Sequence, residues 1–502
     1  MRMKKKLPWI IAGSVLGGLI ALVLCLDGIV SRVAHKQLEK QLSTLDSPYE
    51  ITFDGVFVRV LAGDADITDI KVKDSTMTIT ADRVGVRNIS WLQLAKNKRV
   101  AINRALARGV TLHYTDTASP MVADAYNVCV DVFDLRYDIR DTLFTYNDSV
   151  YFVSMDSAFF VSSDNLHRVK ATTFRTANAG PIELGPLHYQ NNVTKAELIE
   201  LMKEPVNWIE TDVNAVKTSP VHIPTMVTNI LDNKGFQLDS VAVDLKRFYL
   251  YRNTLYPPQH PYPMPQDVLL AIPMPFEVNH VSTKLDNMEI EVSTAYIHGG
   301  HLYLGPVYAS IWNISNRKKA AMTCLASGKI GDMGSFNSRF KMVNNAAADF
   351  ELALAGANLE LSHLAPFTLP ICAISADCHV DSLVSKSKGN RTETTGEFVM
   401  LYNGLHVKVD KNEDIPIRFI INNAGLIESV ANTLLPKANP STPNAAPRRY
   451  RTYGIRDEMQ PVPLYILWPM IDGIKSTLLP GFSVSKKIKT PKPATNTNAA
   501  HK

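Results

Sequence analysis

The stretch Tyr49–Tyr114 constrains the fold more than any other part of the chain, because apolar and polar residues alternate along it with a period of two. The alternating sets are short, and turn sequences such as Asp54-Gly55 and Gly63-Asp64 separate them. Alternation broken by such turns is typical of antiparallel strands with one apolar face. The stretch therefore predicts a sheet whose apolar face must be hidden from water.

The same pattern recurs along most of the chain, which predicts one β region over residues 49–230 and a second over residues 235–430. A hairpin is expected around Asn403-Gly404. Helices are expected over Thr194–Glu204 and Pro205–Val213, the first with a capping box at its start. The proline-rich segment Tyr256–Phe276 predicts a loop or an extended crossing of a sheet edge.

The N-terminus predicts a membrane anchor. A basic segment, residues 1–6, precedes Leu7–Leu26, which contains no charged residue. Twenty helical residues span about 30 Å, the thickness of a bilayer core. The lysines favour a cytoplasmic N-terminus, which puts the bulk of the chain on the other side. The alternative is a cleaved signal peptide, but the apolar run is long and no Ala-x-Ala site follows it. Residues 27–48 predict an amphipathic stalk.

The C-terminal part predicts a loop over residues 431–463, an amphipathic helix over 464–480 and a disordered basic tail over 481–502. The helix Leu464–Leu479 is too short and too polar to span a membrane. It either lies on a membrane surface or caps the end of the sheet, and we favour capping. The cluster Arg448–Arg451 is expected in a solvated loop, with anionic lipid headgroups as a weaker alternative.

Charge and motifs exclude several function classes. The net charge is +5, and the N-terminal basic segment supplies four of these charges, so the rest carries about +1. No basic patch for nucleic acid is therefore expected. The chain has no Gly-rich phosphate loop, Gly-x-Ser-x-Gly elbow or His-Glu-x-x-His motif. We therefore expect no catalytic residues, no cofactor and no enzymatic activity.

Metal and disulfide sites are weakly indicated. His298 and His301 flank a Gly-Gly turn, but two ligands are too few for a protein zinc site. Asp64, Asp66 and Asp69 are expected to be turn and surface residues rather than calcium ligands. An exported chain permits a disulfide between Cys372 and Cys378, and two free buried thiols are the alternative.

The order of these features resembles the AsmA family of Gram-negative envelope proteins. A lysine cluster, one membrane helix and a stalk lead into Phe53–Val58, Gly63–Val72, Ala81–Val86, Ile89–Leu94 and Val100–Tyr114. The stretches Ala355–Leu361 and Thr395–Leu405 are similar to the C-terminal AsmA region, and the middle resembles Bacteroidetes members. The resemblance implies a single-pass anchor in the bacterial inner membrane and a β-rich groove in the periplasm.

The expected fold is therefore mainly β: an elongated antiparallel sheet, curled into a groove or taco, with an N-terminal transmembrane helix and a few short helices. The expected function is handling of phospholipid in an apolar groove, in support of outer-membrane assembly or lipid balance. The alternative is a structural or chaperone-like protein that binds outer-membrane or other periplasmic proteins. The residues expected to line the groove are Val58, Val60, Met77, Ile79, Val110 and Leu112.

Overall fold

The computed structural model is mainly β, with a large sheet and few helices. It describes residues 29–44, 49–60, 62–90, 99–116, 118–138, 143–177, 180–294, 299–331, 334–372, 374–409, 424–478 and 486–487. The chain divides into two compact units. The first unit comprises residues 1–194, 210–232 and 241–243, and the second comprises residues 195–209, 233–240 and 244–502.

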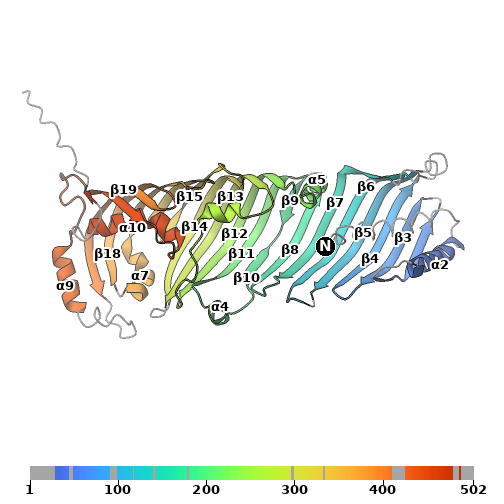
Figure 1. Ribbon diagram of the computed structural model, residues 1–502, viewed down its shortest axis with the longest axis horizontal. Coiled ribbons are helices and arrows are strands. Elements are labelled where there is room, and N and C mark those ends of the chain that lie inside the picture. Colours follow the sequence, from blue (N-terminus) through green and yellow to red (C-terminus); the bar gives the residue numbers. More distant parts are fainter. Residues whose placement is uncertain are drawn as a thin grey trace, which may run out of the picture. The chain divides into compact units, whose positions relative to one another are not determined.

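The first unit is an antiparallel sheet in which most strands pair with the strand that precedes them (Figure 1). Helices α2 Ile29–Thr44 and α5 Ile223–Leu231 accompany it. Its strands are β1 Glu50–Thr52, β2 Gly55–Arg59, β3 Asp64–Lys73, β4 Met77–Ile89, β5 Arg99–Thr115, β6 Val122–Asp138, β7 Leu143–Val161, β8 His167–Ala177, β9 Pro181–Leu184 and β10 Leu187–Asn191. Strands β11 Val206–Pro220 and β12 Phe236–Thr254 contribute residues to both units.

Helix α2 closes one part of the apolar face of this sheet. Its residues Ala34 and Leu38 are buried in one hydrophobic cluster with Val58, Ile67 and other side chains of the first strands. The segment expected to be a stalk is thus helical, and its apolar stripe packs on the sheet.

A series of β-bulges keeps the apolar residues on one face. Asp69, Asn127 and Thr173 have positive φ angles of 52°, 52° and 61° inside their strands. Gly109 has a φ of 61°, and a Cβ at this position would lie 2.0 Å from a carboxylate oxygen of Asp82. Each extra residue shifts the alternation by one position. As a result, Ala107 and Leu112 share a face even though five positions separate them.

The second unit is also an antiparallel sheet in its described strand pairings. Its further strands are β13 Phe276–Thr294, β14 Gly300–Ser315, β15 Ala321–Ile330, β16 Gly334–Val343, β17 Phe350–Glu360, β18 Ile374–Gly389, β19 Glu393–Val409, β20 Arg449–Ile455 and β21 Lys486–Lys487. Its helices are α4 Lys195–Met202, α6 Pro265–Leu270, η2 Leu361–Leu364, α7 Ala365–Cys372, α9 Ala424–Leu434 and α10 Val462–Leu478.

Helix α10 covers the apolar face of β18–β20 (Figure 1). Phe398, Met400 and Tyr402 of β19 are almost fully buried there, with exposed fractions of 2%, 1% and 1%. A Cβ added to Gly473 of α10 would lie only 2.1 Å from Cγ of Phe398, so the helix approaches the ring closely. The helix expected over residues 464–480 is therefore present, and it packs on the sheet as the capping alternative predicts.

The proline-rich segment Tyr256–Phe276 also packs on this unit, although it contains little regular structure. Met264 is completely buried in a cluster with Phe350 of β17 and Tyr465 of α10. The Arg391 guanidinium donates two hydrogen bonds of 2.7 Å to the two carboxylate oxygens of Asp267. These bonds with Arg391 hold the pKa of the Asp267 carboxyl below its usual value.

We expect Arg391→Met to lower the free energy of unfolding by about 0.5–1 kcal/mol at pH 7, because the pair is partly exposed to solvent. The pKa of Asp267 is depressed in the fold, so the stabilisation is present above the unfolded pKa of about 3.9. It is lost as the pH falls through the lower folded pKa. Urea unfolding of both proteins between pH 7 and pH 3 should show a difference that narrows below about pH 4. Arg449→Met, an exposed arginine of β20, is the control and should show no such pH dependence.

Three expectations from the sequence are wrong. Residues 206–220 form strand β11 rather than a helix over Pro205–Val213, because they pair with β9 and β10. Asn403-Gly404 is not a turn but an irregularity inside the continuous strand β19, with φ of 69° at Gly404. The expected loop 431–463 contains the end of α9 and strand β20, which pairs with β19.

Other expectations fall largely outside the described residues. This applies to the membrane helix Leu7–Leu26 and to the tail 481–502, of which only Lys486–Lys487 is described, paired with β20. Within the described ranges, no helix is both long and apolar enough to cross a bilayer. Cys378 is a free, buried thiol, whereas the side chain of Cys372 is not described.

Candidate functional site

A row of apolar side chains crosses the first unit from strand to strand. Each member lies directly opposite the next in the strand register, which runs through β1, β3, β4, β5, β6, β7, β8, β10 and β11. The members are Ile51, Val72, Ile79, Leu112, Ala125, Ala158, Ala171, Leu187 and Val213. With eight strand spacings of about 4.8 Å, the row is about 38 Å long.

Parallel rows extend this surface on both sides. One consists of Met77, Tyr114, Ala123, Phe160, Val169, Tyr189 and Thr211. The other consists of Val56, Ile67, Val84, Ala107, Val130, Val153 and Thr176. We call the three rows together the apolar face of the first unit. The period of two puts the first two rows on one side of the sheet, and the β-bulges bring the third row onto the same side.

The opposite face is mostly polar. The row between the first two apolar rows contains Thr78, His113, Asp124, Phe159, Lys170, His188 and Asp212. His113 and Asp124 lie 2.5 Å apart, and Nδ1 of His188 lies 2.7 Å from Asp212. In the described strands, one side of the sheet carries polar pairs and the other mostly hydrocarbon, so the apolar side is the better surface for an apolar ligand.

The six predicted groove residues separate into two groups. Val58 and Val60 pack in the hydrophobic cluster that α2 covers, and Val58 is only 7% exposed. Met77, Ile79, Val110 and Leu112 are half-buried and lie on the apolar face beyond that cluster. Ile79 and Leu112 are direct cross-strand neighbours. The structure therefore brings four of the six residues together on a surface that is partly open to solvent.

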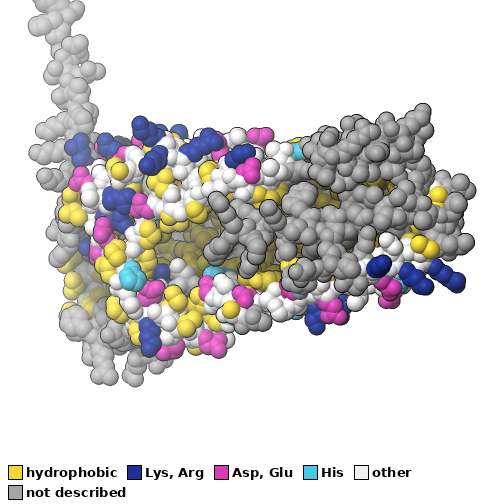
Figure 2. All heavy atoms as spheres, turned by 45° about the vertical axis from the view of Figure 1, so that its right-hand side comes forward, with side chains coloured by type: hydrophobic (Ala, Val, Ile, Leu, Met, Phe, Trp, Pro, Cys, Tyr) yellow, Lys and Arg dark blue, Asp and Glu magenta, His cyan; other side chains and the backbone are white. Residues whose placement is uncertain are grey.

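The space-filling view shows a hollow of the molecular surface in which hydrophobic side chains gather, with charged side chains around it (Figure 2). The extent of the apolar face itself follows from the strand register. A hydrophobic surface of this extent would have to be covered in water. An acyl chain fits its chemistry, because the surface contains hydrocarbon in every strand that it crosses.

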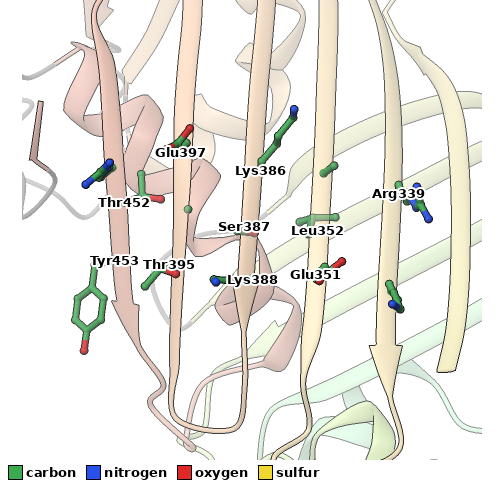
Figure 3. Close-up of a pocket in the computed structure, with 14 residues that line it drawn as sticks. Arg339, Glu351, Leu352, Lys386, Ser387, Lys388, Thr395, Glu397, Thr452 and Tyr453 are labelled. Atoms are coloured by element: carbon green, nitrogen blue, oxygen red, sulfur yellow. The ribbon is translucent and has the colours of Figure 1, made fainter. Parts of the chain in front are cut away.

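A hollow of about 960 Å³ lies on one face of β16–β20 in the second unit (Figure 3). Unlike the apolar face, it is lined by charged side chains from alternate strands, which include Arg339, Lys386 and Lys388. Arg451, from the sequence cluster Arg448–Arg451, also lines it. Sequence reasoning placed this arginine in a loop and did not identify the hollow.

Three groups of kinds that often serve in catalysis, Cys378, Lys195 and Tyr249, are protonated or held in other contacts. Burial raises the pKa of the Cys378 thiol to about 12, which keeps it protonated. The Lys195 ammonium lies 2.9 Å from Glu291 and contacts the Tyr249 hydroxyl. Burial and the hydrogen bond to Glu291 raise the pKa of Tyr249. These contacts fasten α4 to the sheet and leave the phenol protonated.

Metal ligands do not gather in the described ranges, where no group of three or more His, Cys, Asp or Glu side chains could hold an ion. Nδ1 of His301 lies 3.0 Å from the carboxylate of Glu289, a diagonal neighbour on β13, and His298 is outside the described residues. Asp64 and Asp66 lie beside Arg87, and Nη2 of Arg87 donates a 2.7 Å hydrogen bond to Asp66. Arg87 thus offsets part of the negative charge of these two acidic residues.

Comparison with known proteins found no matching family model and no matching curated protein.

Proposed function

We propose that this chain is a membrane-anchored, lipid-handling protein of the AsmA type, and that the apolar face of its first unit holds the acyl chains of phospholipids. In this proposal, Leu7–Leu26 anchors the chain in the bacterial inner membrane and the two β units lie in the periplasm. The activity is non-enzymatic and serves outer-membrane assembly or envelope lipid balance.

The row of nine apolar residues that begins at Ile51 and ends at Val213 is the observation that supports this proposal most strongly. It is apolar at every one of its nine positions, and at about 38 Å it exceeds the roughly 30 Å of a bilayer's hydrocarbon core. The cluster under α2, with eleven buried residues, already forms a local core, and the row extends beyond it. Burial of the row against acyl chains stabilises by about 25 cal/mol per Å².

Native mass spectrometry of the full-length protein, released from mild detergent, tests the proposal. We expect adducts with the masses of phospholipids that persist when the detergent is removed. Delipidated protein should regain them when it is mixed with phospholipid. A protein that carries no phospholipid and takes none up would contradict the proposal, and a polypeptide bound in place of lipid would favour a chaperone-like role.

A further inference from the structure

Charged side chains on the face of β16–β20 that lines this hollow alternate in sign from strand to strand. The cations lie on β16, β18 and β20, and the carboxylates lie on β17 and β19 between them. The cations are Arg339, Lys341, Lys386, Lys388 and Arg451, and the carboxylates are Glu351 and Glu397. All seven line the hollow of about 960 Å³, which therefore carries an excess of three positive charges.

The strand register shows where the pattern is interrupted. Glu351 lies directly between Lys341 and Lys388. Glu397 lies directly between Lys386 and Arg451. The third position of the same kind, between Arg339 and Lys386, is occupied by Ala353. At this one site two cations flank a methyl group in the strand register.

At Ala353 the alternation of cations and carboxylates would predict a carboxylate, and the chain has none there. Arg339 and Lys386 are its direct cross-strand neighbours, with Cβ atoms about 4.5–5.5 Å away, and Lys341 and Lys388 are diagonal neighbours. Within the part of the chain that the structure describes, none of these four cations takes part in an ion pair. Glu351 and Glu397 offset part of this positive charge, but no carboxylate of the described strands lies over Ala353 between Arg339 and Lys386, where like charges on neighbouring strands destabilise the sheet.

We propose that the hollow binds one phosphate-type oxyanion over Ala353. The planar guanidinium of Arg339 suits two oxygens of such a group, and the lysines add point charges. A phosphate carries up to two negative charges, which offset most of the excess. A free phosphate and a lipid headgroup present the same chemistry here. The site lies in the second unit, so it does not depend on acyl chains binding to the first.

Isothermal titration of the full-length protein at low salt tests this site. The probes are inorganic phosphate, short-chain soluble phosphatidylglycerol and short-chain soluble phosphatidylcholine. We expect Ala353→Glu to weaken phosphate binding at least tenfold, because its carboxylate takes the position of the anion. Arg339→Gln should weaken it as well. Ala353→Ser keeps the position free and should bind as the wild type does.

The matched control is Lys329→Gln, an exposed lysine of β15 outside the hollow, which should leave binding unchanged. Binding of phosphatidylglycerol without inorganic phosphate would assign the site to a lipid headgroup, and binding of both would assign it to phosphate itself. The proposal is overturned if the wild type binds neither, or if Ala353→Glu binds as tightly as the wild type. An equal loss in Lys329→Gln would also overturn it, because the attraction would then be unspecific.

Discussion

Replacing Leu112 by glutamate should reduce the phospholipid bound to the purified protein at least tenfold. Leu112 lies at the middle of the apolar face, opposite Ile79 on β4 and Ala125 on β6. A carboxylate at this position would have to leave water when an acyl chain covers it, which costs several kcal/mol. Tenfold corresponds to about 1.4 kcal/mol, so this reduction is a conservative expectation. Ile79→Glu should act in the same way.

The strand register supplies controls on the same strands. Thr111 and Thr80 are direct cross-strand neighbours on the opposite, polar face. Thr111→Glu and Thr80→Glu therefore introduce the same charge, one residue away, without meeting the acyl chain. Native mass spectrometry should find wild-type lipid content in both, and thermal unfolding should show all four variants folded. Equal lipid content in Leu112→Glu and Thr111→Glu would show that lipid, if bound, lies elsewhere.

The largest effect on stability is expected at the contact between β19 and α10. Phe398→Ala should lower the free energy of unfolding by about 3–5 kcal/mol, because the ring is fully buried and leaves a cavity. Val399→Ala is the control, since Val399 points to the other face and is only half-buried. Urea unfolding measures both. A loss of less than 1 kcal/mol in Phe398→Ala would mean that α10 does not pack on this ring.

Replacing Gly473 of α10 by alanine tests the contact between α10 and Phe398 in a second way, because packing and helix propensity predict opposite changes in stability. In an exposed helix, Gly→Ala stabilises by up to about 1 kcal/mol. Gly473→Ala should instead destabilise by about 1–3 kcal/mol, because the new methyl would lie 2.1 Å from Cγ of Phe398. A more stable variant would contradict the packing of α10 described above.

The apolar face could be predicted from the sequence because the side-chain period of a strand is local. The spacing from Met77 to Ile79 and from Val110 to Leu112 was enough to assign these residues to one side. The burial of Val58 and Val60 could not be predicted, because it depends on how α2 packs against the first strands. Local patterning contains no information about which helix covers which strand.

The errors also have physical causes. The phase of alternation changes at Asn403-Gly404, and this change is compatible with either a turn or a bulge. The structure shows a bulge, because β19 pairs with β18 both before and after Asn403-Gly404. The basic hollow was missed because its cations are dispersed along the sequence. The register of β16–β18 is what places Arg339 and Lys386 on either side of Ala353.

The most direct test of the central claim is photocrosslinking in cells, with a photoreactive amino acid in place of Leu112 and, separately, of Thr111. The two positions are adjacent in the chain and lie on opposite faces of the same strand. We predict that the residue at position 112 forms phospholipid adducts after illumination and that the residue at position 111 does not. The absence of lipid adducts at 112, or their equal yield at both positions, would contradict the claim that the apolar face holds lipid.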